Sequence, residues 1–148
     1  MKSQDSIITL MSVEEGTHHS ATFLGKNPDW SPNGSNIVFV PTGLDGGSLA
    51  LYEINTQRTT FIETNYEGTK HRPRFSPDGE LIAYFNGHKK NLDLWVYDTV
   101  VKDHIQLTFD GGWKDNITWS PDSENIAYQQ RNEGANNIWY VPAYGGKS

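Results

Sequence analysis

One pattern of polar and apolar positions occurs three times along the chain. It reads FSPDGELIAY at residues 75–84, and related stretches occupy residues 30–39 and 119–128, a period of 45 and then 44 residues. An aromatic residue is followed by Ser-Pro and an Asp or Asn, and then by alternating aliphatic and aromatic residues. Proline fixes the backbone at the first corner of a turn, and Asp or Asn can bond to the backbone that follows. The pattern therefore predicts two strands joined by a tight turn.

Each copy is followed by further strand-like segments. Residues 49–54, 93–98 and 137–142 form a first set, again spaced by 44, and the more polar residues 60–64 and 105–109 form a second. The central strands are apolar on both faces, as expected of sheets packed between two neighbouring sheets. Four strands in such a period are typical of a propeller blade. The predicted fold class is therefore all-β, a β-propeller of four-stranded blades with three repeats per chain, half of a six-bladed ring.

The chain is expected to form a single half-propeller domain over residues 1–148. The repeat boundaries are predicted only approximately, because a cyclic repeat can be cut at any phase. They are placed at residues 7–47, 48–90 and 91–135, with a partial blade at residues 136–148.

The first twenty-odd residues add strands that the repeats do not need. Residues 7–12 have the pattern of a third strand without its preceding partners, and residues 18–23 that of an outer strand. This gives about thirteen strands, whereas three complete blades have twelve. Either the strand at residues 7–11 or that at residues 137–141 is predicted to be redundant.

Three blades cannot close a ring, because propellers close with about four to eight blades. The terminal blades are expected to expose apolar faces that include Ile7, Leu10, Trp139 and Val141, and such patches usually mark association. We expect a head-to-tail homodimer in which two half-rings form one propeller and each chain lends an outer strand to the other. The rival interpretation is a fragment excised from a longer propeller, which predicts aggregation or instability.

Composition excludes several classes of protein and site. The chain has no cysteine, so disulfides and thiolate metal sites are excluded. Its net charge is −6 and it has no run of Lys and Arg, which argues against nucleic-acid binding. No apolar run approaches the ~20 residues of a membrane span. The N-terminus does not begin like a secretory signal, so we expect either a cytoplasmic protein or one whose leader has been removed.

No catalytic or metal-binding motif is evident in the sequence. Asp78 and Asp122 stand at the corner of the repeated turn and are interpreted as turn formers rather than catalytic acids or metal ligands. The histidines lack the spacing of a metal site; they are His18, His19, His71, His88 and His104. We therefore expect neither enzymatic activity nor a cofactor.

A candidate binding site lies four residues before each repeated aromatic residue. Lys26, His71 and Asp115 occupy these equivalent positions, and Arg72 and Arg74 add charge in the middle repeat. In a ring the innermost strands begin at the mouth of the central channel, so these side chains are expected there. Their type varies while the scaffold repeats, as is typical of binding residues on a rigid frame.

The aromatic-Ser-Pro-Asp-Gly, Ile-Ala-Tyr, Leu-Trp-Val-Tyr-Asp and Leu-Thr segments resemble the WD40-like PD40 repeat of the TolB propeller family. The resemblance covers essentially the whole chain and implies a propeller that receives a segment of a peptide or protein partner at its channel mouth, in the periplasm. The repeat is also used by the propeller domains of prolyl-oligopeptidase-like peptidases, where it gates access to a hydrolase domain. Metal-dependent oligogalacturonate lyases resemble it as well, but their channel histidines are matched here only by His71. A truncated or engineered propeller without its own activity is the remaining alternative.

Overall fold

The computed structural model describes residues 6–11, 20–43, 47–64, 66–132 and 134–144. Within these ranges all regular structure is β-strand, as predicted. The strands are β1 (Ile7–Met11), β2 (Ser20–Trp30), β3 (Asn36–Pro41), β4 (Leu49–Glu53), β5 (Arg58–Ile62), β6 (Thr69–Phe75), β7 (Leu81–His88), β8 (Asn91–Asp98), β9 (Asp103–Gln106), β10 (Trp113–Trp119), β11 (Asn125–Asn132) and β12 (Ala135–Pro142).

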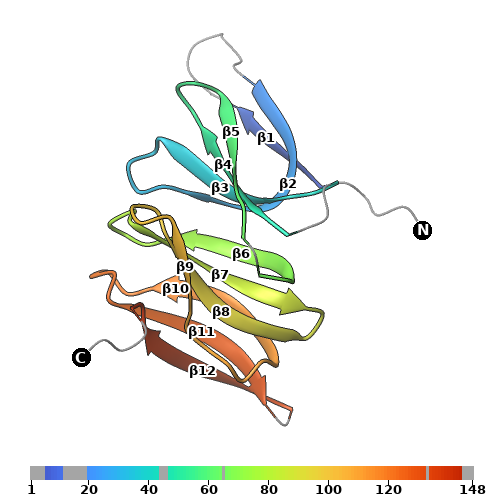
Figure 1. The fold of residues 1–148 in the computed structure, drawn as a ribbon, viewed down its shortest axis with the longest axis vertical. Coiled ribbons are helices and arrows are strands. Elements are labelled where there is room, and N and C mark those ends of the chain that lie inside the picture. The colour runs from blue at the N-terminus through green and yellow to red at the C-terminus, as the bar shows by residue number, and fades with distance from the viewer. Residues whose placement is uncertain (1–5, 12–19, 44–46, 65, 133, 145–148) are drawn as a thin grey trace.

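The strands form three antiparallel sheets that are stacked along the long axis of the molecule (Figure 1). The sheet β1-β2-β3-β4-β5 contains the first blade, β6-β7-β8-β9 is the middle blade, and β10-β11-β12 is the last blade. The blades follow one another along the chain, and within each blade the chain runs from the inner strand to the outer strand. The structure therefore confirms the all-β, partial-propeller prediction.

β2 serves two neighbouring units. Its residues 20–24 pair with β1, and its residues 25–30 pair with β3. The predicted outer strand at residues 18–23 and the first inner strand are thus one continuous strand, although residues 18 and 19 lie outside the described residues. This continuity explains why the described part of the chain has twelve strands instead of the thirteen expected.

The strand registers define equivalent positions in the three blades. Tyr52 pairs with Ile37, Tyr97 with Ile82, and Val141 with Ile126. The third strands are therefore offset by 45 and then 44 residues, the same as the repeated turns. The uniform offset of 44 for these strands was wrong by one residue in the first repeat.

The Ser-Pro turns have the predicted chemistry. The Asp78 carboxylate accepts hydrogen bonds from the Ser76 hydroxyl at 2.5 Å and from the Glu80 backbone N–H at 3.0 Å. Asp122 accepts the equivalent bonds in the last blade. Ser123 adopts φ +64°, close to the φ of +81° at its equivalent Gly79, so the same turn forms at the cost of left-handed backbone in a serine. The interpretation of both aspartates as turn formers is confirmed.

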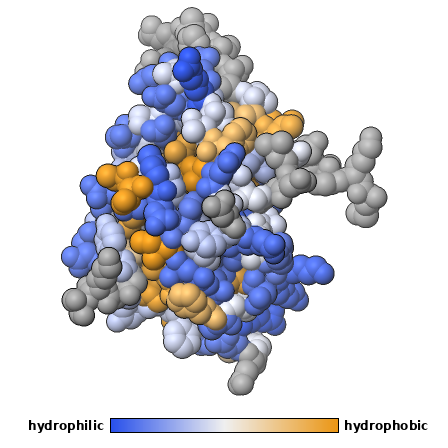
Figure 2. Space-filling model, in the orientation of Figure 1, coloured by the Kyte–Doolittle hydropathy of each residue, from blue (hydrophilic) through white to orange (hydrophobic). Residues whose placement is uncertain are grey.

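Apolar side chains fill the two seams between blades. Val38 and Leu49 of the first blade pack with Ile82 and Tyr84 of the middle blade. The opposite face of the middle blade packs against the last blade through residues that include Leu94 and Ile126. Figure 2 shows that hydrophobic side chains also reach one face of the molecule as separate clusters among hydrophilic ones.

The exposed apolar surfaces differ in part from those predicted. Leu10 is half-buried, because β1 lies over the outer face of the first blade. The side chains of Leu10, Ile8 and Phe23 pack there against the cluster that contains Phe39. Val141 is also half-buried, since it stands opposite Ile126 on the side that faces the middle blade.

The remaining expectations about these surfaces hold. Ile7 and Trp139 are exposed, as predicted. The open face of the last blade instead carries Ile138 and Tyr140, which are 77% and 74% exposed.

Candidate binding site at the inner strands

Every inner strand contains a β-bulge at the same place. The register shifts between Lys26 and Asp29 in β2, between His71 and Arg74 in β6, and between Asp115 and Thr118 in β10. A bulge bends its strand and redirects the side chains beside it. The three variable residues singled out in the sequence therefore stand immediately before three equivalent bends.

The bulges place one residue per blade in the left-handed region. Asn27, Arg72 and Asn116 have φ of 54°, 49° and 55°. Asn tolerates this conformation better than most residues, whereas Arg gains nothing from it locally. A left-handed non-glycine residue held in place by its surroundings often marks a functional position.

The beginnings of the inner strands lie at one end of the blades, here named the mouth end. It comprises the β7–β8 turn at residues 88–91, the described loop residues 63–64, 66–68 and 107–112, and the starts of β6 and β10. Leu92 N–H donates to Gly112 O at 2.8 Å, and Asn86 Nδ2 donates to Glu67 O at 3.1 Å. These bonds join turn, loops and inner strands into one surface.

Two of the predicted site residues meet across a seam. Arg72 of the middle blade forms an ion pair through Nε with the Asp115 carboxylate of the last blade. Both lie at bulges, and the Arg72 side chain remains 44% exposed. The pair fixes the guanidinium between two neighbouring blades while leaving part of it open to solvent.

Arg74 contacts both neighbouring blades. Its guanidinium lies 3.6 Å from the Asp29 carboxylate and donates to Pro28 O at 3.4 Å, and the Trp119 indole N–H donates to Arg74 O at 3.1 Å. Burial raises the pKa of Asp29, although a bond from the Phe75 N–H and the charge of Arg74 partly oppose this. Arg74 is therefore a link across both seams.

His71 is half-buried and surrounded by other cationic groups. Burial, followed by the charges of Lys26, Arg72 and His88, lowers the pKa of its imidazole. Among the described residues, its Nε2 is buried and has no hydrogen-bond partner. Burial and these charges therefore favour the neutral form of the His71 imidazole.

A cleft of about 290 Å³ opens beside the bulge of the last blade. It brings together Arg72, Arg74, Asn116 and Thr118, with Ala127 and Ile138 as apolar walls. Lys26, His71 and Asp115 do not line it. The predicted residues thus form one row along the inner strands, and only Arg72 and Arg74 reach this cleft. Their role in binding stays a prediction.

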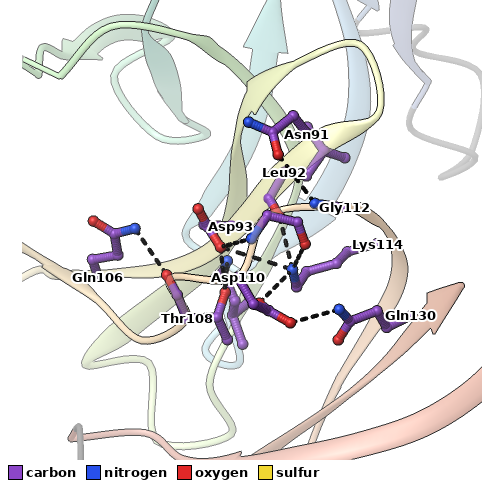
Figure 3. A network of polar contacts seen from close by, with 11 residues as sticks. Asn91, Leu92, Asp93, Gln106, Thr108, Asp110, Gly112, Lys114 and Gln130 are labelled. Carbon is purple, nitrogen blue, oxygen red and sulfur yellow. Dashed lines mark hydrogen bonds and ion pairs between the residues drawn. The ribbon is translucent and has the colours of Figure 1, made fainter. Parts of the chain in front are cut away.

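The sequence reasoning missed two buried lysines that hold the mouth end together. Lys114 is fully buried, and its ammonium group donates to Leu92 O and to the Asp110 carboxylate, both at 2.9 Å (Figure 3). It also contacts Gly111 O and lies 3.7 Å from Asp93. Gln130, which faces Lys114 across the strand pair, donates to the same Asp110 carboxylate at 2.6 Å.

Lys70 occupies the equivalent position in the middle blade. Its ammonium group donates to Tyr66 O at 3.0 Å and to Gly68 O at 3.2 Å, and burial lowers its pKa to about 8. In the first blade the position is Gly25, where a Cβ would lie 2.4 Å from a ring carbon of Phe39. The only available signal was a lysine five residues before two of the repeated aromatics.

Other chemistry is not evident in the described residues. None of their His, Asp and Glu side chains gather in groups of three that could hold a metal ion. No helix among them has the length and apolar character that a membrane crossing requires.

Antiparallel sheets of five, four and three strands stacked side by side, with a β-bulge at the same place in the inner strand of each blade, define the class as β-propeller. The family described as TolB beta propeller domain, PD40, matches residues 12–148. The chain therefore belongs to the TolB propeller (PD40) family.

Curated proteins with two different names are similar in sequence to this chain. Dipeptidyl-peptidase 5 of Porphyromonas gingivalis is 32% identical over 133 residues, which are 80% of this chain and 19% of that protein. The Tol-Pal system protein TolB of Francisella tularensis is 35% identical over 85 residues, 55% of this chain and 19% of that protein. The chain spans about a fifth of the length of these curated relatives.

Solved structures confirm the fold. TolB from Acinetobacter baumannii superimposes with a TM-score of 0.72 at 21% identity and covers 99% of this chain and 43% of that one. The tricorn protease gives a TM-score of 0.60 at 17% identity, over 84% of this chain and 15% of the other.

Proposed function

We propose that this chain is a non-catalytic propeller segment that binds a peptide or protein segment at its mouth end. The observation that carries the proposal is the row of three equivalent bulges, which presents Lys26, His71 and Asp115 on a repeated frame. Binding groups held by rigid strands lose little conformational entropy when a ligand arrives. Arg72, partly exposed between two blades, adds a donor suited to backbone carbonyls and carboxylates.

Peptide selection tests this proposal. Peptides selected from a displayed random library against the wild-type protein are then measured against Lys26→Ala combined with Arg72→Ala. Loss of these two mouth-end contacts is expected to weaken binding by at least about tenfold. Lys102→Ala, an exposed lysine at the opposite end of the blades, is the matched control. Equal binding by all three proteins would place the ligand elsewhere.

A second candidate is the propeller portion of a peptidase, in which the mouth end would gate access to a separate hydrolase domain. The 32% identity to dipeptidyl-peptidase 5 over 133 residues favours it. The test is to read the open reading frame around these residues for a Gly-x-Ser-x-Gly motif followed by an Asp and a His in the α/β-hydrolase order. Such a frame supports the peptidase interpretation, and one without it leaves the binding scaffold.

We also propose that two copies can complete a six-bladed ring head to tail. Ile138 and Tyr140 are exposed, although the equivalent Leu94 and Val96 of the middle blade are fully buried. A neighbouring blade is what buries this face in the middle blade, so a second copy could bury it in the last one. β1 and β12 are redundant in that ring, and one of them must be displaced. Light scattering that finds only a 16.7 kDa monomer contradicts this assembly.

A further inference from the structure

The charged side chains are distributed unevenly between the two ends of the blades. The end opposite the mouth carries the Ser-Pro turns and the β8–β9 turn, with the carboxylates Asp78, Glu80, Asp98, Asp122 and Glu124. Three of them, Asp78, Glu80 and Asp98, lie close enough to Tyr144 that their charges help burial to raise its pKa. The end opposite the mouth is therefore acidic.

Cationic groups gather at the mouth end around His71. Lys26 reaches it from the first blade, where β2 packs beside β6, and His88 reaches it from the end of β7. Lys89 and Lys90 follow in the exposed β7–β8 turn. Among the described residues, Lys26, Lys89 and Lys90 make no ion pair, so the protein does not neutralise these positive groups.

The carboxylates at the mouth end are mostly engaged. Asp115 is paired with Arg72, and Asp93 and Asp110 share the buried Lys114. Glu63 and Glu67 are exposed in the loop before β6 and make no ion pair with the described residues. A chain of net charge −6 thus presents a cationic patch at one end, and such a field steers anionic ligands towards it.

We propose that the segment bound at the mouth end is acidic, with its carboxylates facing Lys26, His71, Arg72 and His88. This inference rests on the proposed peptide-binding function and specifies its ligand. A carboxylate beside His71 offsets the positive charges that disfavour its protonation, so binding is coupled to proton uptake by the imidazole. The titratable and charged groups that act on His71 are Lys26 of β2, Arg72 of its own strand and His88 of β7. Asp115 is paired with Arg72.

Fluorescence anisotropy with three labelled peptides tests the proposal on the full chain. The peptides are a short glutamate-rich segment, the same segment with glutamine in place of glutamate, and the same segment with lysine. The glutamate peptide is expected to bind at least about tenfold more tightly than the glutamine peptide, with an affinity that falls as salt is added. The lysine peptide is expected not to bind.

Variants locate the effect. Lys26→Gln combined with Lys89→Gln is expected to weaken binding of the glutamate peptide roughly three- to tenfold, because each exposed ion pair contributes modestly. Lys102→Gln combined with Arg58→Gln, which removes the same two charges at the opposite end, is expected to change nothing. An equal loss in both proteins would show a response to net charge alone and overturn the proposed site.

Proton coupling gives an independent readout in the wild-type protein. The pKa of His71, measured by NMR, is expected to rise when the glutamate peptide is added to saturation. In a separate titration, the glutamate peptide is expected to bind more tightly at about pH 6 than at about pH 8. Binding of all three peptides with equal affinity overturns the acidic ligand but leaves the peptide-binding function standing. Binding of none of them, together with failure of the library selection, removes the function itself.

Discussion

Lys70 and Lys114 stand at equivalent positions in two blades, but their buried ammonium groups have different hydrogen-bond partners. Lys114 is satisfied by a carboxylate as well as carbonyl groups, whereas the described contacts of Lys70 are two backbone carbonyls. Burial lowers the pKa of Lys70 to about 8. Both side chains hold the loop that leads from an outer strand to the next inner strand, so each works as a fastening at the mouth end.

Replacing Lys114 by Met tests this fastening. The substitution keeps an unbranched side chain but leaves Leu92 O without its donor and Asp110 without its cation, so the free energy of unfolding is expected to fall by about 2 kcal/mol. Urea denaturation followed by tryptophan fluorescence measures the change. Lys102→Met, at an exposed turn, is the control and is expected to have little effect. Equal stability of the two variants would mean that the buried network contributes nothing net.

His104 predicts how stability depends on pH. Its Nδ1 lies 2.8 Å from the Tyr84 hydroxyl, and burial is the largest of the causes that lower the pKa of its imidazole. The unfolded chain, with a histidine pKa of about 6.5, therefore takes up the proton first as pH falls. Stability from His104 is complete above about pH 6.5 and is lost as the pH falls through the lower folded pKa.

Unfolding free energies at about pH 7.5 and about pH 5.5 measure this effect. The loss on acidification is expected to be smaller in His104→Gln than in the wild type, while Lys102→Gln, at an exposed position, keeps the full loss. His71 contributes in the same direction, because its pKa is also lowered. An unchanged pH dependence in His104→Gln would contradict the assignment.

At the residue scale, sequence reasoning identified equivalent positions in the three blades but not the partners of the residues there. The position of Lys26, His71 and Asp115 follows from a repeat of 44 or 45 residues, because equivalent residues occupy equivalent places. The pairing of Arg72 with Asp115 could not be predicted, since it depends on bulges that bend two strands in different blades. The seam role of Arg74 was hidden for the same reason.

Among the elements, the hairpins were predictable and the placement of β1 was not. Turn chemistry and alternation are local properties, so they specify hairpins directly. The sequence gives no local signal that β1 lies over the first blade and that Ile8 and Leu10 cover Phe39 and Tyr52. That arrangement depends on long-range packing.

Two substitutions in β1 test its role as a cover. Leu10→Asn places an amide against the apolar cluster and is expected to lower the free energy of unfolding by roughly 1–2 kcal/mol. Met11→Asn, at the next position of the same strand, is the control because Met11 is 66% exposed and lies outside that cluster. Chemical denaturation compares the two. If both variants lose the same stability, β1 does not cover the first blade.

For the whole molecule, the open face of the last blade predicts the response of assembly to charge. Tyr140→Lys is expected to abolish the proposed self-association while leaving the folded chain as stable as the wild type, because the side chain is 74% exposed. Sedimentation velocity gives the mass of both proteins. Phe109→Lys is the matched control, because this aromatic side chain is 78% exposed in the loop that follows the middle blade and lies on neither open face. Association that persists in Tyr140→Lys would assign the contact to another surface.

The seams also determine how the protein comes apart. Only the middle blade has a described neighbour blade on each side, and residues 81–86 of β7 are all buried. In a linear array of units, stability is greatest where both neighbours are present and loosening starts at the ends. Hydrogen exchange is therefore expected to be slowest for the β7 amides and faster towards β1 and β12. The first and last blades are therefore expected to open before the middle blade, which unfolds last.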